Sequence, residues 1–226
     1  MKKLAPVLAL LLIALGIGAY FLFVRESTQD EASLGDAPLI DGNASGASGT
    51  VPDTPAGTWK LTQNAKVFAG YRIQKTLATH EDTITGRTGD VSGSLTIEAD
   101  TLTQAQFSVN TTTITSGQPL RDKNMKTDGL ETTKFPTAEL QLAEPLELGQ
   151  VSLNTPLKAT AKANLTLHGV TKLTEVSIEA RWNGTSVDIT ANAPIALTDF
   201  GITPPSVPGA TVASNGILEA QLAFVK

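Results

Sequence analysis

Apolar and polar residues alternate along most of the chain between Thr58 and Lys226. Residues 158–167 show this most clearly, because alanine and leucine occupy every second position and lysine, threonine and asparagine occupy the positions between them. A period of two is typical of a β-strand with one buried face. Similar alternation predicts seven further strands, at residues 67–73, 91–99, 105–111, 138–143, 175–180, 186–193 and 218–224.

Residues 116–136 interrupt this alternation. They suit a short helix around residues 120–127, followed by an irregular stretch. About eight antiparallel strands with one apolar face must cover that face, and closure into a barrel also removes exposed edges. The sequence therefore predicts an all-β domain, an antiparallel barrel or sandwich with a short helical insertion, over residues 58–226.

The N-terminus is apolar. Residues 4–24 carry no charge and would span about 31 Å as a helix, close to the hydrocarbon thickness of a bilayer. A cleaved signal peptide is the alternative, with a weak cleavage site at residues 16–19, but the apolar run continues beyond it. We expect a retained transmembrane anchor over residues 1–24. Lys2 and Lys3 then place the domain outside the cytoplasm, or secreted if the segment is cleaved.

Residues 25–57 are rich in Gly, Ala, Ser, Pro and Asp, with one arginine against six acidic residues. Such a composition predicts a flexible acidic linker with a reach of roughly 30 Å. The domain that follows is close to neutral and lacks the clustered Lys and Arg that nucleic-acid binding requires, so we expect no nucleic-acid partner.

Catalytic motifs are scarce. The chain has no cysteine, which excludes disulfides, thiol nucleophiles and Cys-based metal sites. Its two histidines, His80 and His168, form no metal-binding spacing, and no G-x-S-x-G is present. His80 lies in a polar stretch expected to be a loop, and His168 is expected in a strand-end turn. We therefore expect no catalytic residue, no metal site and no enzymatic activity.

The inward positions of the strands are mostly Ala, Val, Leu, Thr and Gly, with few aromatics. About eight strands can enclose either a core of packed side chains or a lumen for one small apolar ligand. Composition leaves both possibilities open.

Several separated stretches resemble one family. They include "FAGYRIQKT", "TGRTGDVSGSLTIE", "PLRDKNMKTDGLETTKFP", "ANLTLHGVTKLTEV" and "ALTDFGI". Together, over about residues 58–226, they resemble the YceI-like family of lipocalin-like, polyisoprenoid-binding bacterial proteins. The chain departs from the family pattern at Leu173, where a proline is usual.

This resemblance implies an antiparallel eight-stranded lipocalin-like barrel with a long apolar pocket, which holds an isoprenoid lipid such as a quinone or a polyprenyl phosphate. Apart from this lipid no cofactor is expected. The inward strand positions and the resemblance together suggest these pocket-lining residues: Phe107, Val109, Leu140, Leu142, Leu165, Leu167, Val176, Ile178 and Phe200. Two other functions compete with lipid binding: a side-chain-filled barrel serving as an envelope interaction module, and an enzyme using His168 or the Arg121–Asp122 pair.

Overall fold

The computed structural model describes residues 29–35, 39–40, 54–77, 80–204, 206–207 and 209–226. The predicted anchor at residues 1–24 lies outside the described residues. Within the described part of the chain, no helix is long and apolar enough to cross a membrane.

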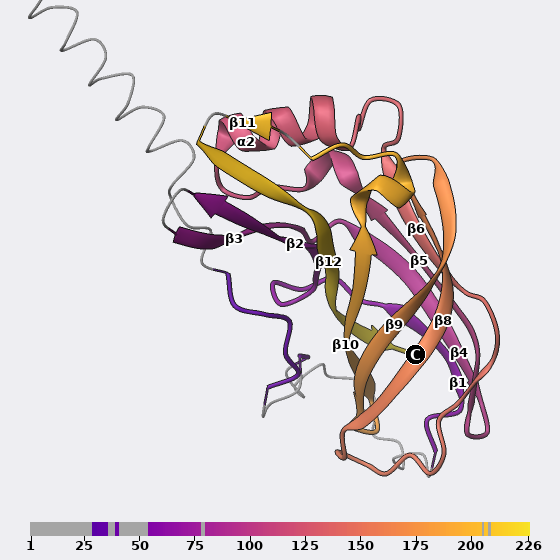
Figure 1. Ribbon diagram of the computed structural model, residues 1–226. Coiled ribbons are helices and arrows are strands. Elements are labelled where there is room, and N and C mark those ends of the chain that lie inside the picture. Colours follow the sequence, from indigo (N-terminus) through magenta and orange to yellow (C-terminus); the bar gives the residue numbers. More distant parts are fainter. Residues whose placement is uncertain (1–28, 36–38, 41–53, 78–79, 205, 208) are drawn as a thin grey trace, which may run out of the picture.

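The described residues form an antiparallel sheet that closes on itself (Figure 1). Its strands and helical turns are β1 (Gly57–Leu61), β2 (Phe68–Leu77), β3 (His80–Thr88), β4 (Val91–Glu98), β5 (Thr101–Asn110), η1 (Thr111–Thr113), α2 (Pro119–Asn124), η2 (Met125–Gly129), β6 (Thr137–Leu142), β7 (Leu146–Glu147), β8 (Leu157–Leu167), β9 (Val170–Trp182), β10 (Ser186–Ala196), η3 (Leu197–Phe200), β11 (Ser206–Val207) and β12 (Ala210–Val225).

Eight strands make a closed ring in the order β1, β4, β5, β6, β8, β9, β10 and β12. The ring closes where β12 pairs with β1, through the register pairs Lys60↔Val225 and Leu61↔Phe224. The prediction of an all-β, antiparallel, eight-stranded barrel is therefore confirmed. The predicted helical insertion is present as α2 and the π-helical turn η2, which lie across one end of the barrel (Figure 1).

The predicted set of eight strands differs from the ring in membership. β1 was not predicted, and the predicted strand at residues 67–73 became β2, which lies outside the ring. β2 pairs with the first three quarters of β12, and β3 pairs with β2, so β2 and β3 form a hairpin that extends the sheet. The loop expected around His80 is wrong, because His80 begins β3.

β3 escapes the alternation rule because its buried face is polar. Lys75 and Asp82 are direct cross-strand partners in β2 and β3, and they form an ion pair of 2.8 Å. Four positions further along β3, on the same face as Asp82, Gly86 has no side chain. A Cβ at Gly86 would lie 2.6 Å from the Tyr71 ring, so this close approach requires glycine.

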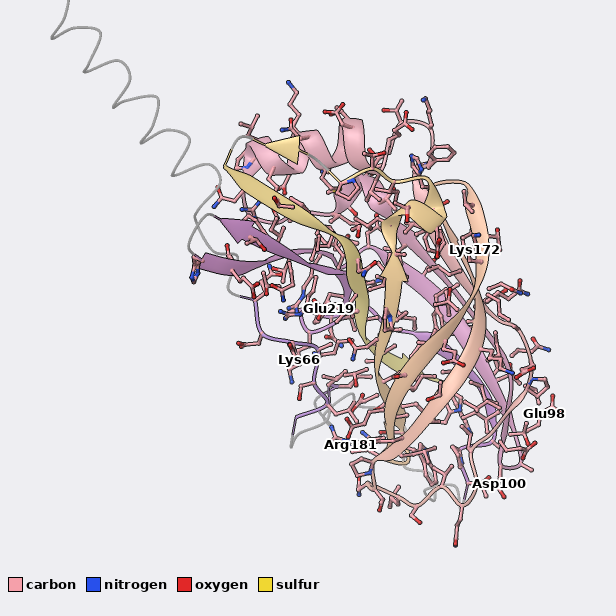
Figure 2. The ribbon with its side chains drawn as sticks, in the orientation of Figure 1. Lys66, Glu98, Asp100, Lys172, Arg181 and Glu219 are labelled. Atoms are coloured by element: carbon pink, nitrogen blue, oxygen red, sulfur yellow. The ribbon has the colours of Figure 1, made fainter. Side chains whose placement is uncertain are left out.

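The linker expected at residues 25–57 is partly docked. Leu34 and Leu39 are buried, and residues 29–35 and 39–40 lie along the outside of the barrel (Figure 1). They cover a buried polar cluster that includes Glu219 and Arg181, both labelled in Figure 2. The composition of residues 25–57 gives no indication of this docking, which buries two leucines.

Candidate functional site

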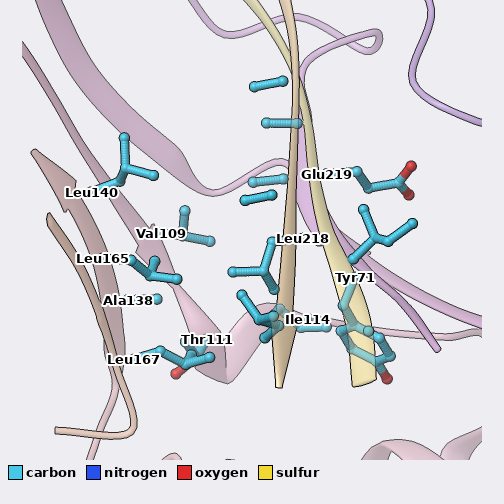
Figure 3. Close-up of a pocket in the computed structure, with 18 of the residues that line it drawn as sticks. Tyr71, Val109, Thr111, Ile114, Ala138, Leu140, Leu165, Leu167, Leu218 and Glu219 are labelled. Atoms are coloured by element: carbon cyan, nitrogen blue, oxygen red, sulfur yellow. The ribbon is translucent and has the colours of Figure 1, made fainter. Parts of the chain in front are cut away.

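A cavity of about 590 Å³ lies inside the barrel. Its volume is within the range of small-molecule pockets in proteins, roughly 300–1,000 Å³. Eight of the nine predicted residues lie on its wall: Phe107, Val109, Leu140, Leu142, Leu165, Leu167, Val176 and Ile178. Figure 3 shows Leu140, Leu165 and Leu167 facing Leu218 of β12 across the space. This cavity argues against a barrel that is filled by its own side chains.

Small side chains create the space. Inward positions on the middle of β8 and β10 are alanines, whose side chains are too small to fill the interior of an eight-stranded barrel. Ala163 is 1% exposed and Ala193 is 3% exposed, so both side chains are buried in the wall. The alanines that line the cavity are Ala69, Ala105, Ala138, Ala161, Ala163, Ala191, Ala193 and Ala220.

One end of the cavity is closed by packed apolar residues. Leu95, Leu102 and Leu222 line the cavity there, and they belong to a cluster with Trp59, Trp182 and Phe224. The rings of Phe107 and Phe224 meet edge to face, with their centroids 5.8 Å apart. The lining residues named at this end are therefore all apolar.

The opposite end, beneath α2 and η2, carries polar lining residues that include Tyr71, Lys75, Arg121, Asn124 and Asp128. Four further polar residues belong to the lining: Thr111, Glu139, Thr203 and Glu219. Burial raises the pKa of Tyr71 to about 12, against a smaller opposing effect from the nearby guanidinium of Arg121. Tyr71 is therefore a neutral phenol at physiological pH, able to donate one hydrogen bond toward the cavity.

Asp122, beside Arg121, anchors α2. Its carboxylate accepts hydrogen bonds from the Ser116 backbone N–H at 2.8 Å, the Ser116 hydroxyl at 2.5 Å and the Thr115 hydroxyl at 2.6 Å. Partial burial raises the pKa of Asp122, but these hydrogen bonds outweigh it and hold the pKa below its usual range. The two residues of the Arg121–Asp122 pair thus have different roles. Arg121 lines the cavity, and Asp122 fixes the segment that carries Arg121.

His168 holds a turn together, outside the cavity lining. His168 and Gly169 both have positive φ, 51° and 74°, where β8 turns into β9. The His168 ring nitrogens lie 3.0 Å from the Phe200 carbonyl oxygen and 3.0 Å from a Glu131 carboxylate oxygen. The ring also packs edge to face on Phe135, with centroids 4.5 Å apart. The strand-end turn expected at His168 is present, and its imidazole ties that turn to two neighbouring segments.

Phe200, the ninth predicted residue, does not line the cavity. It lies in η3, where its ring is 2% exposed and packs in a separate cluster with Leu165, Leu167 and Ile202. The turn of η3 places Phe200 in this cluster and not on the cavity wall, and the alternation rule cannot predict this because η3 is not a strand.

The sequence reasoning missed further lining residues. Leu95, Leu218 and Leu222 lie on predicted strands, and extending the same alternation would have found them. Lys75, Arg121 and Asn124 carry no such signal, because polar residues just after a predicted strand or on a predicted short helix resemble an ordinary solvated surface.

Among the residues that the structure describes, no three His, Asp or Glu side chains lie close enough together to bind a metal ion. His80, at the start of β3, and His168, in the β8–β9 turn, belong to different parts of the fold.

Comparisons with known proteins bear on this arrangement. A model of the YceI-like domain matches residues 59–224. No curated protein sequence matches the chain significantly. Among solved structures, a polyisoprenoid-binding domain from Saccharophagus degradans, implicated in plant cell wall breakdown, aligns with a TM-score of 0.58 at 16% identity, covering 74% of this chain and 97% of that one. BcnA from Burkholderia cenocepacia aligns with a TM-score of 0.53 at 13% identity, covering 68% of this chain and 95% of that one. At these identities the structural likeness supports the fold.

Proposed function

The chain belongs to the YceI-like family, and from that membership and the geometry of its cavity we propose that it binds an isoprenoid lipid. The tail lies among the aliphatic walls, and the head group lies beneath α2 and η2. One observation carries this proposal: a cavity of about 590 Å³ has mostly aliphatic walls, and its end beneath α2 and η2 carries the polar side chains of Tyr71, Arg121 and Asn124. The Saccharophagus degradans domain of the same fold is described as polyisoprenoid-binding, which supports the choice of lipid.

Burial of the tail supplies the affinity. Each buried CH₂ group contributes about 0.8 kcal/mol. A tail of ten buried carbons therefore gains about 8 kcal/mol before the cost of immobilising the ligand, and immobilisation removes a large share of that gain. Binding of this kind needs no catalytic residue, which fits a site made almost wholly of aliphatic side chains.

The polar end suits a head group that accepts hydrogen bonds. Tyr71 offers a neutral O–H, and Arg121 and Lys75 offer N–H donors. A quinone carbonyl and a prenyl phosphate both accept from such groups, so the proposal includes both head groups. Asp128 lies on the same lining and would oppose a doubly charged phosphate, whereas it would affect a neutral quinone less.

A membrane tether completes the proposal. Residues 1–24 have the length and apolar character of an anchor, and Lys2 and Lys3 favour an extracytoplasmic position for the barrel. Isoprenoid lipids reside in the same bilayer, so we propose a membrane-tethered, extracytoplasmic protein that sequesters or carries such a lipid.

The test begins with the full chain, purified from its membrane fraction in mild detergent. Solvent extraction and mass spectrometry should reveal a copurified isoprenoid lipid. The delipidated chain is then offered a short prenylated quinone, a short prenyl phosphate and a saturated fatty acid of similar length, and native mass spectrometry counts the bound molecules. Preference for a prenylated probe supports the proposal and identifies the head group. Absence of any copurified lipid, together with no uptake of either prenylated probe, would refute it.

A further inference from the structure

A segment of the predicted linker, which we call the strap (residues 29–35 and 39–40), is bound to the outside of the barrel. Its two leucines are buried, with Leu34 at 5% and Leu39 at 6% exposure. Leu39 belongs to the same apolar cluster as Trp59. The strap is thus held by apolar burial as well as by polar contacts.

The first polar contact is centred on Glu219. Its buried carboxylate forms ion pairs with Arg72 at 2.9 Å and Arg87 at 2.7 Å. The same two guanidinium groups donate to strap carbonyls, Arg72 to Gln29 at 2.6 Å and Arg87 to Asp30. In return the Ala32 N–H donates to Glu219 at 3.4 Å. Buried charges are stable only when their hydrogen-bonding groups are matched, and the strap backbone supplies part of that matching.

The second polar contact is centred on Asp188 and Arg181. The Leu39 N–H donates to the buried Asp188 carboxylate at 3.0 Å. Arg181 donates to the carbonyl oxygens of Leu34 at 3.3 Å and Gly35 at 3.0 Å. Two separate sets of charged side chains therefore form hydrogen bonds to the backbone of the strap.

These contacts give the strap a direction. Ala32 meets Glu219, and Ser33 donates to Gln221 at 3.1 Å. Leu39 meets Asp188, whose register partner on β12 is residue 223. The strap therefore runs alongside β12 in the same direction, and its N-terminal residues lie toward the start of β12. That is the end of the barrel covered by α2 and η2, where the cavity carries its polar residues.

We propose that the strap fixes how the barrel faces the membrane, with the α2–η2 end toward the bilayer. This inference rests on the proposed anchor at residues 1–24. Only residues 25–28 then separate the anchor from Gln29, the first strap residue that is hydrogen-bonded to the barrel. The distance between residue 24 and Gln29 is therefore at most about 17 Å. A free linker of residues 25–57 would instead have a reach of roughly 30 Å and no preferred orientation. The strap thus keeps the barrel close to the membrane, with the polar end of its cavity beside the bilayer.

The test measures which end of the barrel is nearer the lipid. The chain has no cysteine, so single cysteines can carry a donor dye at Lys123→Cys on α2 or at Asp100→Cys, which lies at the far end of the barrel (Figure 2). The 16 residues of β12 span roughly 40 Å along the barrel axis. With full-length chain in vesicles that contain acceptor-labelled lipid, energy transfer should be several-fold greater from position 123 than from position 100. Equal transfer, reversed transfer or failure of the chain to join the vesicles overturns the inference.

Matched variants connect the orientation to the strap. Leu34→Ser should loosen the strap and reduce the difference in transfer between the two positions, whereas Glu31→Ser, at an exposed strap residue, should preserve it. Circular dichroism verifies that both barrels are folded. An unchanged difference in Leu34→Ser contradicts a role for the strap. Lipid extraction is measured independently: oriented chain without bound lipid refutes only the proposed ligand, and bound lipid with equal transfer refutes only the orientation.

Discussion

Filling the cavity should weaken lipid binding without unfolding the barrel, and Ala163 is the residue at which to do so. It lies on β8, lines the cavity and is 1% exposed. It clusters with Val176 and Ala193, and Leu140 and Leu218 pack against this cluster. The substitution Ala163→Leu therefore directs three additional carbons into the space proposed for the tail.

The magnitude follows from the displaced carbons. If three leucine carbons take the place of three tail carbons, the loss is about 2.4 kcal/mol at about 0.8 kcal/mol per carbon. This corresponds to an affinity about 50-fold weaker. The added carbons enter existing space, so the usual cost of overpacking a dense core does not apply. We expect the free energy of unfolding of the lipid-free chain to stay the same or to rise.

The assay is a titration with the prenylated probe that binds the unmodified chain, followed by equilibrium binding and by urea unfolding of the lipid-free protein. Asn164→Leu is the matched control, because it adds apolar carbons at the next position of β8, where the side chain is exposed. We expect it to leave affinity unchanged. Unaltered affinity in a folded Ala163→Leu variant would show that the tail does not pass this residue, and the proposed position of the ligand would be wrong.

Three further substitutions probe the polar contacts. Glu219→Ala removes the carboxylate that pairs with the partly buried guanidinium groups of Arg72 and Arg87, and it should lower the free energy of unfolding by about 3 kcal/mol in urea denaturation, at the low end of the range for a broken buried ion pair. Asp122 has a depressed pKa, so its contribution to stability is full above about pH 4 and is lost as the pH falls through the folded-state pKa; Ser116→Ala should raise that pKa in an NMR titration and shrink the acid-dependent loss. His168→Ala should cost about 1–3 kcal/mol through its two hydrogen bonds, whereas His80→Ala, at an exposed residue, should stay within about 0.5 kcal/mol.

The alternation rule predicted the barrel well where one strand face is apolar. β8 is the best case, because its residues alternate between buried alanine or leucine and exposed polar side chains over its second half. The same rule placed Leu165 and Leu167 on the inward face, where they line the cavity. It could not identify Phe200 as a residue of another cluster, because η3 has no period of two.

Long-range pairing was beyond the same rule. The closure of β12 onto β1 depends on residues 163 or more positions apart in sequence, and β1 is only five residues long. The docking of the strap cannot be predicted from its own sequence, because its contacts use backbone carbonyl and N–H groups, which are present in any sequence. Their charged partners, such as Arg72 and Glu219, lie far away along the chain and resemble ordinary surface residues of β2 and β12.

The misread regions have a physical property in common. β3 and the strap both place polar groups where burial would normally select apolar ones: the Lys75–Asp82 pair on the inner side of the hairpin, and the Glu219 cluster beneath the strap. At such positions the local sequence pattern does not predict the fold. Exceptions of this kind concentrate at functional sites, where a protein tolerates a loss of stability. Lys75 lies at the polar end of the cavity, and the strap directs the chain toward the same end. Lys75 and the strap, which the alternation rule does not predict, therefore make one end of this apolar barrel different from the other. A barrel that holds a lipid needs such a difference to bind its ligand in one direction.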